Sequence, residues 1–92
     1  MTRRADRIRH ILQTRFAPAE VVVEDESARH AGHAGAAPGG ETHYAVQVVS
    51  PAFRGMSRLA RSRAVHAALA EEFASGLHAL SLRLRTPEEA GG

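Results

Sequence analysis

The chain has 92 residues, of which 43% are hydrophobic, and this length suits one small domain with a single core. It contains no cysteine, which excludes disulfides, a thiol nucleophile and any metal site built on its own thiolates. The net charge is +2, and all twelve basic residues are arginines. No apolar run is long enough to span a membrane and no export signal is visible at the N-terminus, so we expect a cytoplasmic protein without a membrane segment.

The first half of the chain predicts a helix, a strand and a long loop. Ile8, Leu12 and Phe16 recur at helical spacing in residues 3–16, and Pro18 ends this helix. Three valines at 21–23 predict a short strand with an acidic end. Residues 28–40 are rich in glycine and lack apolar periodicity, so we expect them to form a flexible loop.

The second half predicts a strand, one long helix and a final strand. Residues 43–50 alternate between two faces, and Ser57 suits the N-cap of a helix from Arg58 to Ser75. Gly76 fits the C-terminal cap of that helix. The next strand alternates leucines with polar residues up to Pro87, and residues 88–92 are expected to be a frayed tail. The residues expected to meet in one core are Val65, Leu69 and Phe73 from the helix and Leu80, Leu82 and Leu84 from the last strand.

This order of elements predicts a single α+β domain over residues 1–92. Three strands with one apolar face need a cover, and two helices on the same side supply it in a two-layer α-β-β-α-β arrangement. The last strand is reached through a helix, which allows a mixed three-stranded sheet.

No catalytic motif is present, because the chain lacks a P-loop, a GxSxG elbow and an HExxH helix. We therefore expect that the protein is not an enzyme.

The histidines are candidate metal ligands. His30 and His33 lie three residues apart in the glycine-rich loop, where imidazoles either bind a metal or are simply solvated. His78 follows the helix cap, a position that fixes its direction and suits either a ligand or a packed side chain. His43 is compatible with both roles, and the structural one is favoured. His10 and His66 fall within helices and are interpreted as structural or solvated.

Four arginines form a block without acidic residues at the start of the long helix: Arg54, Arg58, Arg61 and Arg63. Such a block is compatible with nucleic acid, with an acidic protein surface, or with a solvated helix face.

Several segments together resemble the BolA family. They are GETHYAVQVVSPAF, the FRGMSR turn, the RxRAVHAALAEEF helix, GLHALSLRLRTPEE and, in the loop, DESARHAGHAG. The resemblance extends from about Arg7 to Glu89, and the order and spacing of the segments make it specific. It implies a fold similar to a type II KH domain without the GxxG loop.

The resemblance implies a partnership with a monothiol glutaredoxin. Members of the family share a two-iron, two-sulfur cluster with that partner in iron sensing or iron–sulfur assembly. The C-terminal histidine ligand of the family falls on His78, and the loop ligand falls on His33, with His30 as its rival. Two imidazoles replace two thiolates on one iron in Rieske centres. The partner's cysteine and its bound glutathione would supply the thiolates, so the isolated chain is expected to hold no cofactor.

The resemblance also implies a second activity. Some members act as DNA-binding transcriptional regulators of morphology and stress response, and duplex DNA would contact Arg54, Arg58, Arg61 and Arg63. Where the family often has Arg-His-Arg in the long helix, this chain has Arg61-Ser62-Arg63. A role for that middle histidine therefore does not transfer.

Overall fold

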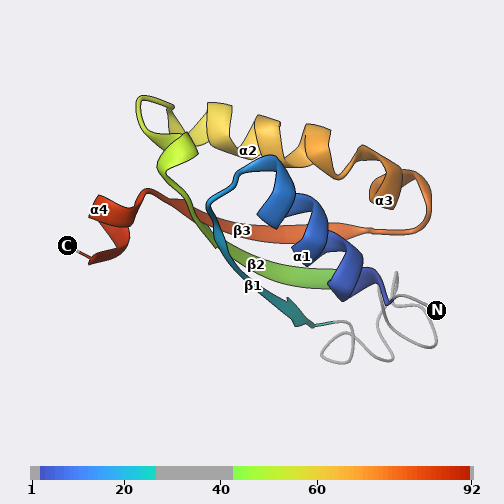
Figure 1. The fold of residues 1–92 in the computed structure, drawn as a ribbon. Coiled ribbons are helices and arrows are strands. Elements are labelled where there is room, and N and C mark those ends of the chain that lie inside the picture. Colours follow the sequence, from blue (N-terminus) through green and yellow to red (C-terminus); the bar gives the residue numbers. More distant parts are fainter. Residues whose placement is uncertain (1–2, 27–42, 92) are drawn as a thin grey trace.

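The computed structural model describes residues 3–26 and 43–91, which form one sheet with helices packed on one side of it (Figure 1). The predicted flexible loop 28–40, with His30 and His33, lies outside the described residues. The strands are β1 (Glu20–Asp25), β2 (His43–Val49) and β3 (Ala79–Arg85). The helices are α1 (Arg4–Arg15), the 3-10 turn η2 (Pro51–Phe53), α2 (Arg58–Ala68), α3 (Ala70–Ala74) and α4 (Pro87–Gly91).

The sheet is mixed, as the sequence predicts. Its strand order is β1-β2-β3; β1 pairs antiparallel with β2, and β2 pairs parallel with β3. The helical crossover from β2 to β3 allows the parallel pairing. Because of that pairing, β2 and β3 begin at the same end of the sheet, where His43 lies opposite Ala79.

The core lies between the helices and one face of the sheet. Ile8 and Leu12 from α1 and Val65 and Leu69 from α2 and its end are fully buried. The β2 residues Tyr44, Val46 and Val48 are buried beneath them, and Leu80, Leu82 and Leu84 pack against this cluster from β3. The alternation predicted for β2 is therefore confirmed, and the domain has a single apolar face covered by helices.

The predicted long helix is interrupted. Residues 58–75 form α2 and the shorter α3, and Leu69 lies between them with φ −103° and ψ 16°. The prediction that Ser57 is the N-cap of α2 is confirmed, because the Ser57 hydroxyl accepts a hydrogen bond from the Ala60 amide at 3.1 Å. Phe73 packs against the core, as expected, but it is only partly buried, and it stacks on His66 with ring centroids 5.1 Å apart.

The prediction of a frayed tail is wrong over residues 88–91, which belong to α4. The Glu89 carboxylate accepts a hydrogen bond from the Thr86 amide at 2.8 Å, and the Glu89 amide donates one to the Thr86 hydroxyl at 3.2 Å. This reciprocal pair is a capping box, which starts a helix at this point. None of the helices described is long and apolar enough to cross a membrane.

Candidate functional site

His78 lies in the tight connection between α3 and β3. The Leu77 amide donates to the Glu72 carbonyl at 2.9 Å, and Gly76 has φ +126°, which together make a Schellman cap. Leu77 is buried, with 4% of its surface exposed, and it fixes the chain immediately before His78. The His78 side chain is exposed, so its imidazole is accessible from solvent on a backbone held by the cap and by the start of β3.

The parallel register brings His43 beside His78. The centroids of the two rings are 5.2 Å apart, with an angle of 54° between their planes. His43 is half-buried at the start of β2, whereas His78 is exposed. Among residues 3–26 and 43–91, no group of three or more histidines and carboxylates is arranged to hold a metal ion. This end of the sheet therefore offers two neighbouring imidazoles.

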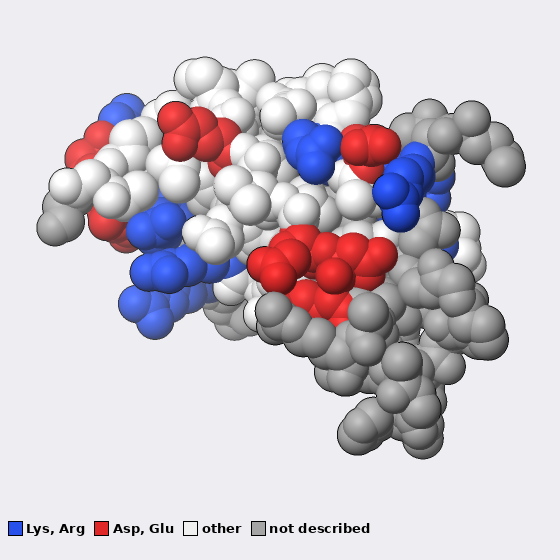
Figure 2. Space-filling model, turned by 90° about the horizontal axis from the view of Figure 1, so that it is seen from below, with Lys and Arg blue, Asp and Glu red and all other residues white. Residues whose placement is uncertain are grey.

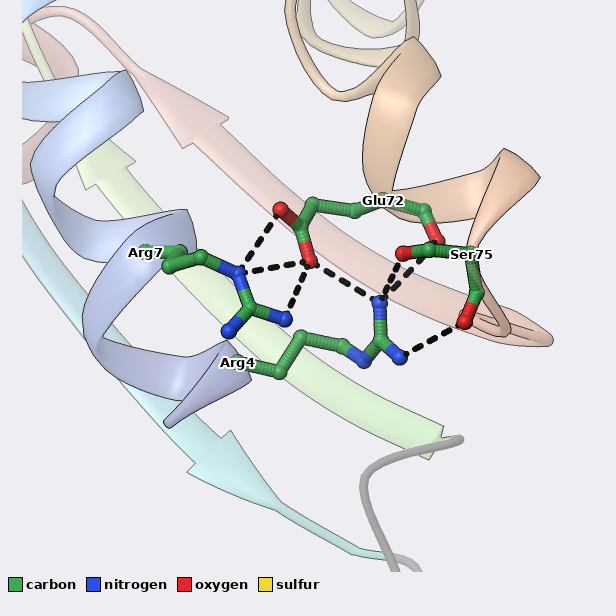
Figure 3. A network of polar contacts seen from close by, with 4 residues as sticks. All are labelled: Arg4, Arg7, Glu72 and Ser75. Carbon is green, nitrogen blue, oxygen red and sulfur yellow. Dashed lines mark hydrogen bonds and ion pairs between the residues drawn. The ribbon is translucent and has the colours of Figure 1, made fainter. Parts of the chain in front are cut away.

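A buried ion-pair network holds the connection that carries His78 (Figure 3). Arg4 donates to the Glu72 carboxylate at 2.9 Å and to the Ser75 hydroxyl and carbonyl at 2.9 and 3.1 Å. Arg7 adds two hydrogen bonds of 3.0 Å to the same carboxylate. Hydrogen bonds from Arg7 lower the pKa of Glu72, although burial opposes this shift. The network ties α1 to α3 directly beneath the Gly76 cap.

The four arginines of the predicted nucleic-acid surface have different environments. Arg61 has 8% of its surface exposed and donates to the Met56 and Leu84 carbonyls at 3.0 and 3.1 Å. It also pairs with Glu89 at 2.6 Å. Arg54 pairs with Glu88 at 2.7 Å. Arg58 and Arg63 are exposed and form no ion pair with any residue that the structure describes.

The hydrogen bonds to Glu89 have an electrostatic consequence. Its hydrogen bond with Arg61, assisted by that with the Thr86 amide, lowers the pKa of Glu89 to about 2. This carboxylate is therefore charged at neutral pH and neutralises Arg61. Of the four arginines, Arg58 and Arg63 are the ones that remain exposed without a described counter-ion.

One acidic patch and one basic group stand apart on one face of the molecule (Figure 2). Seen from below, acidic side chains form one patch beside the grey residues, and a group of basic side chains lies nearer the end that carries α4 (Figure 2). The end of β1 supplies three consecutive acids, Glu24, Asp25 and Glu26. They lie at the histidine end, because Asp25 pairs with Tyr44 in the sheet and the Glu26 amide donates to the His43 carbonyl at 2.8 Å.

Two features of this site were missed from the sequence. Arg4 and Arg7 look like solvated residues of an amphipathic helix, and nothing in the sequence links them to Glu72, which is 65 or more positions away. The partners of Arg54 and Arg61 come from α4, a segment that was expected to be frayed. The capping pattern Thr86-Pro87-Glu88-Glu89 is the signal that would have revealed α4.

Known proteins share this sequence and fold. The chain is 47% identical over 89 residues to the chloroplastic protein BOLA1 of Arabidopsis thaliana, covering 95% of this chain and 56% of that protein. It is 46% identical over 90 residues to the chloroplastic/mitochondrial SufE-like protein 1 of the same organism, covering 94% of this chain and 24% of that protein. The chain thus spans about half the length, or less, of these relatives.

A solved structure agrees with the sequence match. The structure of BolA1 from Arabidopsis thaliana superposes with a TM-score of 0.84 at 46% identity, covering 97% of each chain. Residues 12–89 match the family of BolA-like proteins. This range includes both the histidine end and the helix α2. The chain therefore belongs to the BolA-like protein family.

Proposed function

We propose that this chain is a non-catalytic partner of a monothiol glutaredoxin and shares a two-iron, two-sulfur cluster with it, in iron sensing or in iron–sulfur assembly and trafficking. The observation that carries this proposal is the exposed imidazole of His78, held by a Schellman cap and by the Arg4–Glu72 network. Imidazole nitrogen is an established ligand of such clusters. A chain without cysteine must obtain its thiolates from a partner, and glutaredoxin with glutathione supplies them.

A second ligand from this chain would come from another histidine. His33 is the first candidate and His30 its rival, and both lie outside the described residues. The structure adds His43, whose ring centroid is 5.2 Å from that of His78. A bound cluster would supply iron and sulfide, either to store electrons or to be passed on to other proteins. The role of this chain is to present its imidazoles on a rigid end of the sheet.

The test is anaerobic reconstitution of the cluster with a monothiol glutaredoxin and glutathione, using single alanine variants of each histidine. We expect His78→Ala to abolish the visible absorption and circular dichroism of the shared cluster, because one iron loses its best-fixed ligand. His33→Ala should weaken or reshape the spectrum, because the remaining histidines can replace it. His10→Ala is the control, since His10 is exposed on α1, and its spectrum should not change.

Association and cluster retention are separate readouts. Size-exclusion chromatography of the proteins without iron reports association alone, and the spectrum reports the ligands. A His78→Ala complex with an unchanged spectrum and unchanged cluster lifetime would contradict the assignment of His78.

A second candidate function, DNA-binding regulation, rests on the exposure of Arg58 and Arg63 on α2. Arg61 is unsuited to a phosphate contact, because it is buried and bound by Glu89. Phosphate contacts by the two exposed arginines would give weak binding that falls steeply with salt. Duplex DNA is therefore a probe in the binding experiment described below.

A further inference from the structure

A groove of about 600 Å³ lies between α2 and β3, at the opposite end of β3 from His78. Arg58 and Ser62 line it from α2, and the consecutive residues 82–85 line it from β3. Within the described residues 3–26 and 43–91, β3 is an edge strand, since β2 is its only partner in the sheet. One wall of the groove is therefore the open edge of a sheet, and the other is a helix.

The groove carries unbalanced positive charge. Arg61 and Glu89 both line it and neutralise one another. Arg58, Arg83 and Arg85 also line it, and none of them forms an ion pair with a residue in the described part of the chain. The Arg85 Nε is buried without a hydrogen-bond partner among the described residues, although such groups are normally satisfied. The groove therefore favours an anionic ligand that accepts hydrogen bonds.

Glu89 indicates which anion fits. Its carboxylate reaches the groove from α4 and accepts hydrogen bonds from Arg61 Nη1 at 2.6 Å and Nη2 at 3.3 Å. Carboxylates pair with guanidinium groups in this two-pronged geometry. The Glu89 side chain thus already occupies one arginine of the groove, while Arg58, Arg83 and Arg85 have no such carboxylate partner among the residues that the structure describes.

We propose that this groove binds an acidic segment of a partner protein, in extended conformation along β3. An added chain at a sheet edge directs alternate side chains to the two faces of the sheet. Leu82 and Leu84 mark the helix-covered face, so Arg83 and Arg85 belong to the other face, whereas Arg58 stands on the helix side. Guanidinium groups consequently flank such a segment on both sides, and glutamates or aspartates at successive positions find a partner.

The position of Arg63 distinguishes this ligand from duplex DNA. Arg63 is exposed on α2, as Arg58 is, but it does not line the groove. The phosphates of a duplex lying across the helix would contact both arginines. A peptide within the groove depends on Arg58 and on the β3 arginines, and it does not need Arg63.

The proposal is tested by fluorescence anisotropy of the full chain with three labelled probes. The first is a ten-residue peptide that alternates glutamate and serine, the second replaces each glutamate with glutamine, and the third is a 20-base-pair DNA duplex. We expect the glutamate peptide to bind, and the glutamine peptide to bind at least about tenfold more weakly, because each lost charge pair removes an interaction in the range of a tenfold change.

Matched variants locate the binding site. Arg58→Gln and Arg85→Gln should each lower the affinity for the glutamate peptide about tenfold. Arg63→Gln, which makes the same charge change on α2, should alter this affinity less than twofold. Thermal melts check that each variant is folded. Arg83→Gln, which alters an exposed side chain, takes the place of Arg85→Gln if that variant does not fold.

Three outcomes would overturn the proposal. They are equal binding of the glutamine peptide, an equal loss with Arg63→Gln and Arg58→Gln, and binding of the duplex that is tighter than that of the peptide and sensitive to Arg63. The last result would instead support the DNA function. None of these outcomes bears on His78, which precedes the other end of β3, so failure here is distinct from failure of the His78 assignment.

Discussion

At the scale of single residues, Glu72 links the core to the candidate site. Its side chain has 8% of its surface exposed and receives hydrogen bonds from Arg4 and Arg7. Gly76, four positions later, has a positive φ, and a Cβ there would lie 3.2 Å from Arg4 Nη2. The charge network and the cap that precedes His78 therefore share the same small space.

We predict that Glu72→Gln lowers the free energy of unfolding by about 3 kcal/mol, because it leaves Arg4 buried without a charge partner. Urea unfolding at pH 7 measures this loss. Glu71→Gln is the control, since Glu71 is an exposed neighbour on α3, and its effect should stay within about 0.5 kcal/mol. Equal stabilities of the two variants would show that the network contributes nothing.

The same comparison has a defined pH dependence. The pKa of Glu72 is lowered from 4.5 in the folded state, so the unfolded chain binds its proton more readily. The contribution of Glu72 to stability is therefore complete above pH 4.5 and is lost as the pH falls through the folded pKa. The stability difference between the unaltered chain and Glu72→Gln should shrink in that acidic range, and a constant difference would exclude ionisation as its origin.

At the scale of elements, the break between α2 and α3 changes which side chain contributes most to the core. Leu69 is fully buried at the break, whereas Phe73, one turn later, is partly buried against His66. Residues 3 to 4 positions apart share a helix face only while the helix is continuous. The apolar spacing through position 69 thus identifies fully buried side chains, whereas Phe73, beyond the break, packs against the core and is only partly buried.

We predict that Leu69→Ala lowers the free energy of unfolding by about 2–5 kcal/mol, because it opens a cavity in a fully packed region. Phe73→Ala should cost less, about 1–2 kcal/mol, since its side chain is only partly buried where it packs against the core. Chemical denaturation of both variants gives the comparison. A larger loss for Phe73→Ala would restore a continuous helix as the better description.

Much of the fold was predictable because its signals are local. Alternation in residues 43–49, the Ser57 cap and the Gly76 cap each depend on residues a few positions apart, and all three are confirmed. The mixed sheet followed from the helical crossover. The pairs Arg4–Glu72 and Arg61–Glu89 were not predictable, because charged side chains on helix surfaces have no periodic signature that identifies a distant partner.

At the scale of the whole molecule, the two candidate binding regions differ in charge. The histidine end lies beside Glu24, Asp25 and Glu26, and the groove is lined by arginines. An acidic partner segment is therefore favoured at the groove. The small net charge of +2 conceals this separation.

The parallel pairing of β2 and β3 has a consequence for occupancy by two partners at once. Arg85 lies seven positions after His78, which corresponds to roughly 23 Å at the rise of an extended strand. A four-residue segment matches the part of β3 that lines the groove, residues 82–85, and does not reach the imidazoles. We therefore predict the same dissociation constant for a four-residue glutamate peptide with and without the assembled glutaredoxin complex. Anisotropy titrations in both states measure it, and a steep loss of affinity in the complex would mean that one partner covers the full length of β3. Equal affinities would mean that the length of β3 keeps the two regions far enough apart for the proposed glutaredoxin complex and an acidic segment to be bound at the same time.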